Sequence, residues 1–139
     1  MHFGFDDDSG DFAIGTRDLG EAEVRWSDQF FQQYTLPMPW SGSRQVVHVV
    51  VDTALPTETQ RLQLFVDGVP ATEMGSITAP ALDATIPIDS ASMMVLGNRS
   101  DGERSFRGRL QYAAIYTAAL TPAQLTSNVG VLLDSDDAP

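Results

Sequence analysis

The chain has 139 residues, with 8 Lys and Arg against 19 Asp and Glu, which gives a formal net charge of -11 at pH 7. This charge repels nucleic-acid phosphates and anionic lipid surfaces, so nucleic acid is excluded as an expected partner. Cysteine is absent, which excludes disulfides and thiolate metal sites. No segment approaches the roughly 20 apolar residues of a membrane span. The first residues lack the features of a signal peptide, so an exported form would need a signal that has been removed or a longer precursor.

The sequence begins with a predicted strand at residues 2–5, followed by an acidic stretch, FDDDSGD. Calcium prefers carboxylate and carbonyl oxygens, and this stretch supplies several. The spacing fails the EF-hand pattern, because with Asp6 and Asp8 at its first and third positions the last position is Arg17. A calcium site and a solvated hairpin turn are therefore both open here.

Residues 12–15 and 21–26 are predicted to pair as strands, joined by a turn at residues 18–20. The second strand alternates between a polar face and an apolar face, which carry Glu21, Glu23 and Arg25, and Ala22, Val24 and Trp26, respectively. Two strand carboxylates about 5 to 5.5 Å apart can act as nucleophile and acid in a glycosidase. Arg25 favours the charged carboxylate instead, so we predict an exposed ion-paired face and no catalysis by Glu21 and Glu23.

Residues 27–45 combine four aromatic residues with Pro37 and Pro39, which predicts no central strand. Trp40 has two interpretations. Its ring could stack on a sugar, or it could plug one end of a sandwich.

Valine dominates residues 46–52, which predicts a buried central strand. Residues 61–67 alternate, with Leu62, Leu64 and Val66 facing inward, and Asp67-Gly68 predicts a hairpin turn. His48 lies within the valine run without a second histidine or a nucleophile nearby in sequence. We therefore expect a structural imidazole whose hydrogen bonds are satisfied.

Residues 75–92 predict loops with one short edge strand at 84–88, and residues 93–96 predict a strand that ends at Gly97. A charged loop follows, and its candidate ligand-binding residues are Asn98, Arg99, Asp101, Glu103 and Arg104. Asn98 and Asp101 could hydrogen-bond hydroxyl groups, and the two arginines could contact carboxylates. A solvated hairpin loop is the alternative interpretation.

Residues 106–116 predict a strand covered on both faces, because apolar side chains occupy both parities. Thr121, Pro122 and Gln124 have the spacing of a capping box with proline at the first helical position. We expect a helix of about two turns that ends near residues 128–130, where Asn and Gly tolerate a left-handed stop. Residues 132–139 are predicted as an acidic tail.

These patterns predict an all-β fold, an antiparallel β-sandwich with one short C-terminal helical turn. Two stretches, LGNRSDGERSFRGRLQYAAIYTAALTPAQLTSN and VVHVVVDTALPTETQRLQLFVDGVPA, resemble laminin-G-like domains of the concanavalin A-like lectin/glucanase superfamily. FAIGTRDLGEAEVRW is similar to a strand pair in bacterial members. The resemblance implies a jelly roll over residues 1–131 that binds carbohydrate, glycosaminoglycan or protein outside the cell or in the periplasm.

The chain departs from the family in two places. Gln111 stands where many relatives have an aspartate that helps to hold structural calcium, and a neutral amide is a weaker ligand, so we expect no cofactor and keep calcium as the alternative. We also expect that residues 1–131 lack the usual first strands, and an unpaired sheet edge invites another chain.

Three functions follow from the sequence and the resemblance. The first is a non-enzymatic recognition module that binds carbohydrate or a protein partner through sandwich-end loops. The alternative is a structural or accessory subunit that docks on a larger assembly, or on its own copies, through an open sheet edge or a loop face. The third is a glycoside hydrolase, but the sequence offers no convincing pair of catalytic carboxylates for this function.

Overall fold

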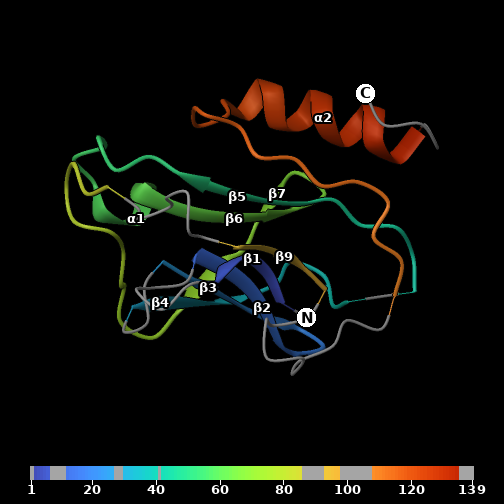
Figure 1. Ribbon diagram of the computed structural model, residues 1–139, viewed down its shortest axis with the longest axis horizontal. Coiled ribbons are helices and arrows are strands. Elements are labelled where there is room, and N and C mark those ends of the chain that lie inside the picture. Colours follow the sequence, from blue (N-terminus) through green and yellow to red (C-terminus); the bar gives the residue numbers. More distant parts are fainter. Residues whose placement is uncertain are drawn as a thin grey trace.

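A computed structural model describes residues 2–6, 12–26, 30–40, 42–85, 93–97 and 108–134. Within these ranges the chain forms two antiparallel sheets that pack face to face, with a helix beyond the smaller one (Figure 1). The six-stranded sheet has the order β8-β4-β3-β2-β1-β9, made of β8 (Thr72–Met74), β4 (Phe31–Thr35), β3 (Glu21–Arg25), β2 (Phe12–Asp18), β1 (His2–Asp6) and β9 (Met93–Leu96). The three-stranded sheet has the order β5-β6-β7, made of β5 (Val47–Val51), β6 (Leu62–Val66) and β7 (Val69–Pro70). The predicted β-sandwich is confirmed.

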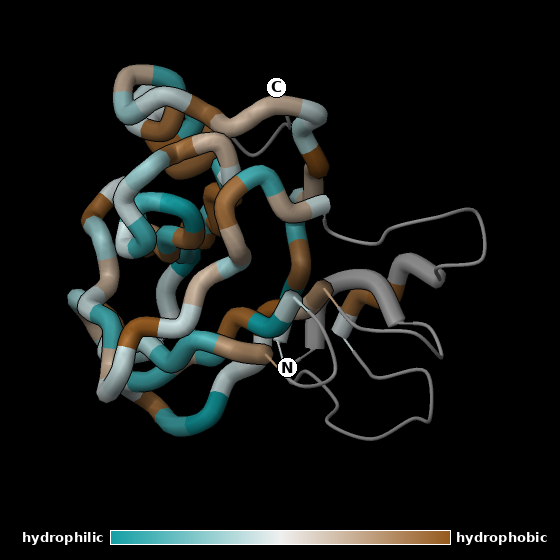
Figure 2. Tube along the Cα trace, turned by 90° about the vertical axis from the view of Figure 1, so that its left-hand side faces the viewer, coloured by the Kyte–Doolittle hydropathy of each residue, from teal (hydrophilic) through white to brown (hydrophobic). Residues whose placement is uncertain are grey.

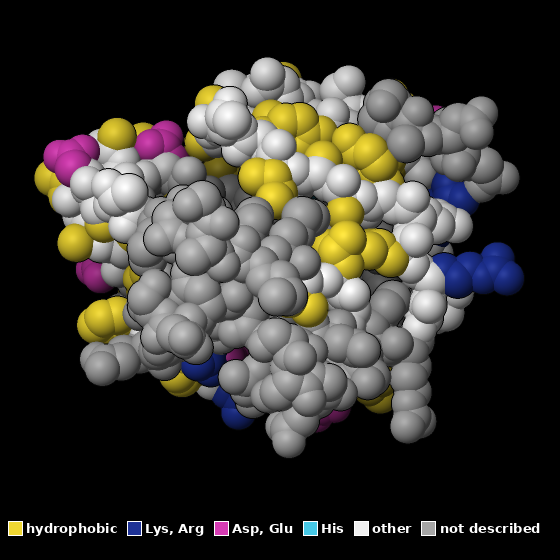
Figure 3. Space-filling view, in the orientation of Figure 1, with side chains coloured by type: hydrophobic (Ala, Val, Ile, Leu, Met, Phe, Trp, Pro, Cys, Tyr) yellow, Lys and Arg dark blue, Asp and Glu magenta, His cyan; other side chains and the backbone are white. Residues whose placement is uncertain are grey.

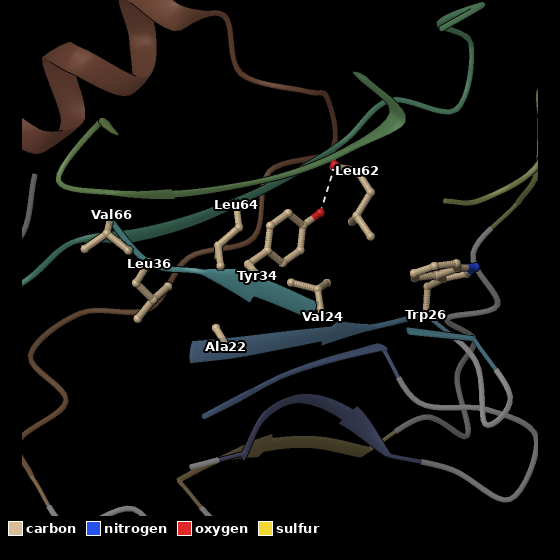
Figure 4. Packing of buried hydrophobic residues seen from close by; sticks show 8 residues of the cluster. All are labelled: Ala22, Val24, Trp26, Tyr34, Leu36, Leu62, Leu64 and Val66. Carbon is tan, nitrogen blue, oxygen red and sulfur yellow. Dashed lines mark hydrogen bonds between the residues drawn. The ribbon is translucent and has the colours of Figure 1, made fainter. Parts of the chain in front are cut away.

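The core lies between the two sheets and comes from alternate residues of facing strands (Figure 4). Its buried members are Ala22, Val24, Trp26, Tyr34, Leu36, Leu62, Leu64 and Val66. Opposite residues in a ladder share a face of the sheet. The pairing of Ala22 with Tyr34 and of Val24 with Gln32 therefore leaves Glu23 and Gln33 on the outer face. The predicted apolar and polar faces of residues 21–26 are confirmed.

One hydrogen bond joins the two sheets through the middle of the core. The Tyr34 hydroxyl donates to the Leu62 carbonyl over 2.9 Å (Figure 4). Burial, followed by the negative charge of Glu73, raises the pKa of the Tyr34 phenol far above its usual value. The phenol therefore stays neutral and keeps its proton for this bond.

The predicted hairpin turn at Asp67-Gly68 is confirmed. Both residues have positive φ, 50° and 78°, as the tight turn between β6 and β7 requires. Asp67 also fixes the neighbouring strand, because its backbone N–H donates to the Val46 carbonyl and its carboxylate accepts from the Val46 N–H over 2.8 and 2.7 Å. The predicted inward residues of β6 are buried.

Two strand predictions between residues 27 and 52 are wrong. β4 (Phe31–Thr35) lies inside the six-stranded sheet, between β3 and β8, because Pro37 and Pro39 come after the strand and remove no ladder hydrogen bond from it. β5 is an edge strand, because among the described strands it pairs only with β6. Most of its side chains are accordingly half-buried.

His48 on β5 differs from the satisfied imidazole that we predicted. Its Nδ1 is buried and has no hydrogen-bond partner in the described part of the chain. Burial lowers the pKa of His48 below its ordinary value of 6.5, because the charged imidazolium would lose its hydration.

This lowered pKa predicts a stability that depends on pH. Below pH 6.5 the unfolded chain protonates His48 more readily than the folded protein, so the free energy of unfolding should fall as the pH falls. Urea titrations at pH values between 7.5 and 5.5 measure this change. The free energy of unfolding should fall less with pH in the His48→Gln variant than in the parent protein. An identical pH slope for the His48→Gln variant and the parent protein would contradict the prediction.

The loop between β5 and β6 contains a one-turn helix, α1 (Glu58–Arg61). The Arg61 guanidinium closes this loop by donating to the carbonyls of Leu55, Pro56 and Pro80 over 2.8 to 3.1 Å. Farther along, Ala84 and Thr85 are not in a strand, and the rest of the predicted strand at 84–88 lies outside the described residues.

The C-terminal part of the chain forms a third layer over the three-stranded sheet (Figure 1). The described part of the predicted strand at 106–116 is irregular, and no ladder pairs residues 108–116 with a described strand. That prediction is wrong, because the segment runs beside α2 (Pro122–Asp134) and joins no edge of the described sheets (Figure 1). In the view turned by 90°, α2 is seen nearly end-on at the top, with hydrophobic residues in brown (Figure 2).

The predicted capping box of α2 is confirmed. The Thr121 N–H donates to Gln124 Oε1 over 2.8 Å, and the Gln124 N–H donates to Thr121 Oγ1 over 3.4 Å. The helix is longer than predicted and runs through Gly130 to Asp134, into the range predicted as a tail. Leu125 is buried, and packing of this face outweighs the weak helix propensity of glycine. No helix of the described residues is long and apolar enough to cross a membrane.

Candidate functional site

A pocket of about 230 Å³ opens at the edge of the six-stranded sheet, where β8 ends beside β4. Among the described residues, β8 pairs with Gln33, Tyr34 and Thr35. The chain then turns away at Gly75, whose φ is 73°, and β8 covers no more of β4. The uncovered end of β4 and the loop after β8 form the walls, which are Phe31, Gln32, Gln33, Met74, Ser76 and Thr78.

Gln32 fixes the shape of this pocket. Its side chain is only 2% exposed, and its Oε1 accepts from the Thr78 N–H over 2.7 Å. Its Nε2 donates to the carbonyls of Gln33 and Met74 over 2.8 and 3.2 Å. The amide oxygen thus ties the loop after β8 to β4, and the amide nitrogen ties the end of β8 to the same strand.

Phe31 supplies the exposed aromatic surface of the pocket, with 39% of the residue accessible. The Arg25 guanidinium carbon lies 5.7 Å from the centre of the Phe31 ring, within cation–π range. Arg25 is itself held by Glu23, whose Oε1 accepts from Nη2 over 3.2 Å. Arg17 lies 3.9 Å from the other oxygen of Glu23. The ring therefore has a partner that limits its motion.

This arrangement suits binding better than catalysis. Phe31 offers an apolar ring, Gln33 a primary amide, and Ser76 and Thr78 two hydroxyl groups. An aromatic ring with a few convergent hydrogen-bonding groups is typical of a ligand site. Glu23 is engaged by two arginines, as predicted for an ion-paired strand face, and that is not the environment of a general acid.

The structure places Trp40 away from this pocket. Its backbone N–H donates to Leu19, and its indole N–H donates to the Glu21 carbonyl over 3.2 Å. The half-buried ring packs against the core at the Glu21 end of β3. Phe31 pairs with Arg25 at the opposite end of the same strand. Trp40 and the pocket therefore do not form one site.

The predicted loop residues Asn98, Arg99, Asp101, Glu103 and Arg104 lie outside the described residues, as does most of the Asp6–Asp8 stretch. Among the residues that the structure describes, no group of three or more His, Asp or Glu side chains could hold a metal ion. Gln111, which stands in place of a calcium-binding aspartate, is exposed.

The comparisons with known proteins give one match. A laminin-G family model, described as the concanavalin A-like lectin/glucanases superfamily, matches residues 1–126. The chain belongs to this superfamily. No curated protein and no solved structure matches it significantly. Membership in the lectin/glucanase superfamily agrees with the two antiparallel sheets, and it assigns no ligand.

Sequence reasoning missed the pocket of this lectin/glucanase-type domain. Phe31 stood out only as one of several aromatic residues in the segment 27–45. Ser76 and Thr78 lie in a part of the stretch 75–92 that was predicted as loop. The available signal was the alternation of Phe31, Gln33 and Thr35 with Gln32 and Tyr34, which is the two-residue period of a strand.

Proposed function

We propose that this domain is a non-enzymatic recognition module that binds carbohydrate in the pocket beside β4. The observation that carries the proposal is the exposed Phe31 ring in a pocket whose other walls include an amide and two hydroxyls. A sugar presents an apolar C–H face together with hydroxyl groups, and both match this lining.

The contacts around the pocket support preorganised binding. Arg25 restrains the Phe31 ring from one side, and Gln32 holds the loop that carries Ser76 and Thr78. Binding to walls that are already ordered loses less conformational entropy than binding to a mobile loop. The pocket is small and open, so we expect it to take one or two sugar units of a longer chain.

The test is glycan binding by the isolated chain, first on an array and then by calorimetry with the best glycan. Phe31→Ala should weaken binding roughly tenfold or more, as expected for truncation of a central aromatic contact. Leu82→Ala is the matched control, because Leu82 is an exposed apolar residue outside the pocket. Equal affinities of the Phe31→Ala variant and the parent protein would rule out the pocket as the site.

The charged loop with Asn98, Arg99, Asp101, Glu103 and Arg104 and the ring of Trp40 are further proposed contacts. Asp101→Ala and Trp40→Ala in the same assay separate them from the pocket. Loss of affinity in these two variants, with Phe31→Ala unchanged, would move the site to the sandwich-end loops. A chelator should leave the affinity unchanged, because we propose no metal requirement.

We also propose that the protein works outside the cell or in the periplasm, where laminin-G-like domains are often found. Glycan chains accessible to such a module are abundant there. Fractionation of the native host, with an antibody against this chain, tests the location.

A further inference from the structure

The pocket beside β4 needs polar groups to select its ligand. In Figure 3, hydrophobic side chains gather over α2 and the segment that precedes it, which form the layer over the three-stranded sheet. The pocket lies at the edge of the other sheet, and Phe31 and Met74 are the large apolar side chains in its lining. In a ligand pocket, a few well-placed hydrogen-bonding groups fix the orientation of the ligand and supply the specificity.

The ladder between β3 and β4 shows which way the main chain of β4 points. The Trp26 N–H donates to the Phe30 carbonyl over 3.1 Å, and the Leu36 N–H donates to the Gly20 carbonyl over 2.8 Å. Hydrogen-bonded pairs alternate along an antiparallel ladder, so the even-numbered residues of β4 direct their N–H and C=O groups toward β3. The odd-numbered residues direct these groups to the opposite side, toward β8. They are Phe31, Gln33 and Thr35.

β8 occupies two of these three positions, opposite Gln33 and Thr35. The third position would place Ser76 opposite Phe31, but the chain turns away at Gly75. Ser76 lines the pocket instead, together with Phe31. Among the described residues, none forms a hydrogen bond with the main-chain N–H or C=O of Phe31. These two groups therefore open into the pocket.

We propose that the main-chain N–H and C=O of Phe31 bind two adjacent hydroxyl groups of one sugar ring, in the ladder position that β8 leaves empty. This inference rests on the carbohydrate function proposed above. The N and O atoms of one extended residue lie roughly 3 Å apart and point to the same side of the strand. Adjacent ring hydroxyls in the gauche arrangement have a comparable spacing. One hydroxyl accepts from the N–H while its neighbour donates to the C=O.

This arrangement gives the main chain and the side chain of Phe31 different roles. The ladder with β3 and the Gln32 side chain hold β4 in place, so the N–H and C=O cannot shift to meet a different spacing. A sugar that lacks either hydroxyl leaves one main-chain group without a partner, which weakens binding. The ring thus contacts the apolar face of the sugar, and the main chain selects the pair of hydroxyls.

Hydrogen exchange tests the empty ladder position without any ligand. The amide of Phe31 should exchange about tenfold faster or more than the amides of Gln32 and Gln33, because β3 and β8 protect those two. Two-dimensional NMR of the nitrogen-labelled protein resolves the three amides. Equal protection of all three would overturn the proposal, because the position opposite Phe31 would then be occupied.

The binding test uses the methyl glycosides of glucose, galactose and mannose, with analogues in which one ring hydroxyl at a time is replaced by hydrogen. NMR titration measures each affinity. For the glycoside that binds best, loss of either of two adjacent hydroxyls should weaken binding about tenfold, and other losses should have smaller effects. Binding that tolerates every single loss would overturn this inference alone. Binding to none of these glycosides and to no glycan on the array would overturn the carbohydrate function as well.

Two variants separate the ring from the main chain. Phe31→Ala keeps both main-chain groups, so it should bind more weakly but still require the same two hydroxyls. Phe31→Pro also lacks the N–H, at a position where the ladder does not use it. It should lose the requirement for one of the two hydroxyls, and an unchanged requirement would overturn the proposal. Circular dichroism checks the fold of both variants. If Phe31→Pro is misfolded, the exchange and analogue measurements on the parent protein decide.

Discussion

Replacing Leu64 by alanine should lower the free energy of unfolding by about 3 to 5 kcal/mol, the largest effect that we expect from a single substitution in this domain. Leu64 is 1% exposed and lies at the centre of β6, facing the six-stranded sheet. Its side chain fills the space beside Tyr34 and Val24 (Figure 4). The neighbouring strands are fixed by their ladders, so they cannot collapse into the cavity that alanine leaves.

Urea denaturation followed by tryptophan fluorescence measures this loss, because Trp26 belongs to the same core. Leu82→Ala is the control for the same chemical change at an exposed position, and its effect should stay below about 0.5 kcal/mol. If both variants lost the same stability, Leu64 would not lie in the principal core. The slope of the free energy of unfolding against urea concentration should be the same in the Leu64→Ala variant and the parent protein. An equal slope would show that the substitution does not alter the unfolded state.

Replacing Gln32 by leucine should cost about 2 to 4 kcal/mol of stability and should also weaken glycan binding. Leucine has a similar size but leaves the Thr78 N–H and the Met74 carbonyl without the partners that they have in the folded protein. Each half-buried backbone group that loses its partner is penalised, and the loop after β8 loses its attachment to β4. The wall of the pocket should then become mobile.

Gln33→Leu is the matched control, since it makes the same change one residue along β4, where the side chain faces outward. It should reduce glycan affinity directly but leave the free energy of unfolding within about 0.5 kcal/mol of the parent value. Thermal melts and calorimetry on both variants separate the two roles. Equal stability of Gln32→Leu and the parent protein would contradict the anchoring role of Gln32.

Elements whose signals lie within a few residues could be predicted from the sequence. The alternation along β6, the turn at Asp67-Gly68 and the capping box at Thr121 each depend on contacts between near neighbours in the chain. The strand and turn patterns together predicted the sandwich, and the family resemblance added membership in the lectin/glucanase superfamily, which the family match shows. These features gave the correct fold class.

Elements that depend on distant partners could not be predicted. The segment at 108–116 has the composition of a strand, yet it lies over a sheet and not at its edge. The length of α2 beyond Gly130 depends on packing, as does the edge position of β5. The pocket exists because β8 is two residues shorter than β4, and sequence spacing does not reveal such a mismatch.

The position of β1 beside β9 also bears on how the chain folds. Phe3 pairs with Leu96, so two residues that are neighbours in the sheet lie far apart in the sequence. Such long-range pairing gives a high contact order, and closing so long a loop slows folding. During synthesis, β1 can pair with β2 early, but its second side has no β9 until residue 96 has left the ribosome. Until then that edge of β1 is open to pairing with other chains, and chaperone protection would matter most in that interval.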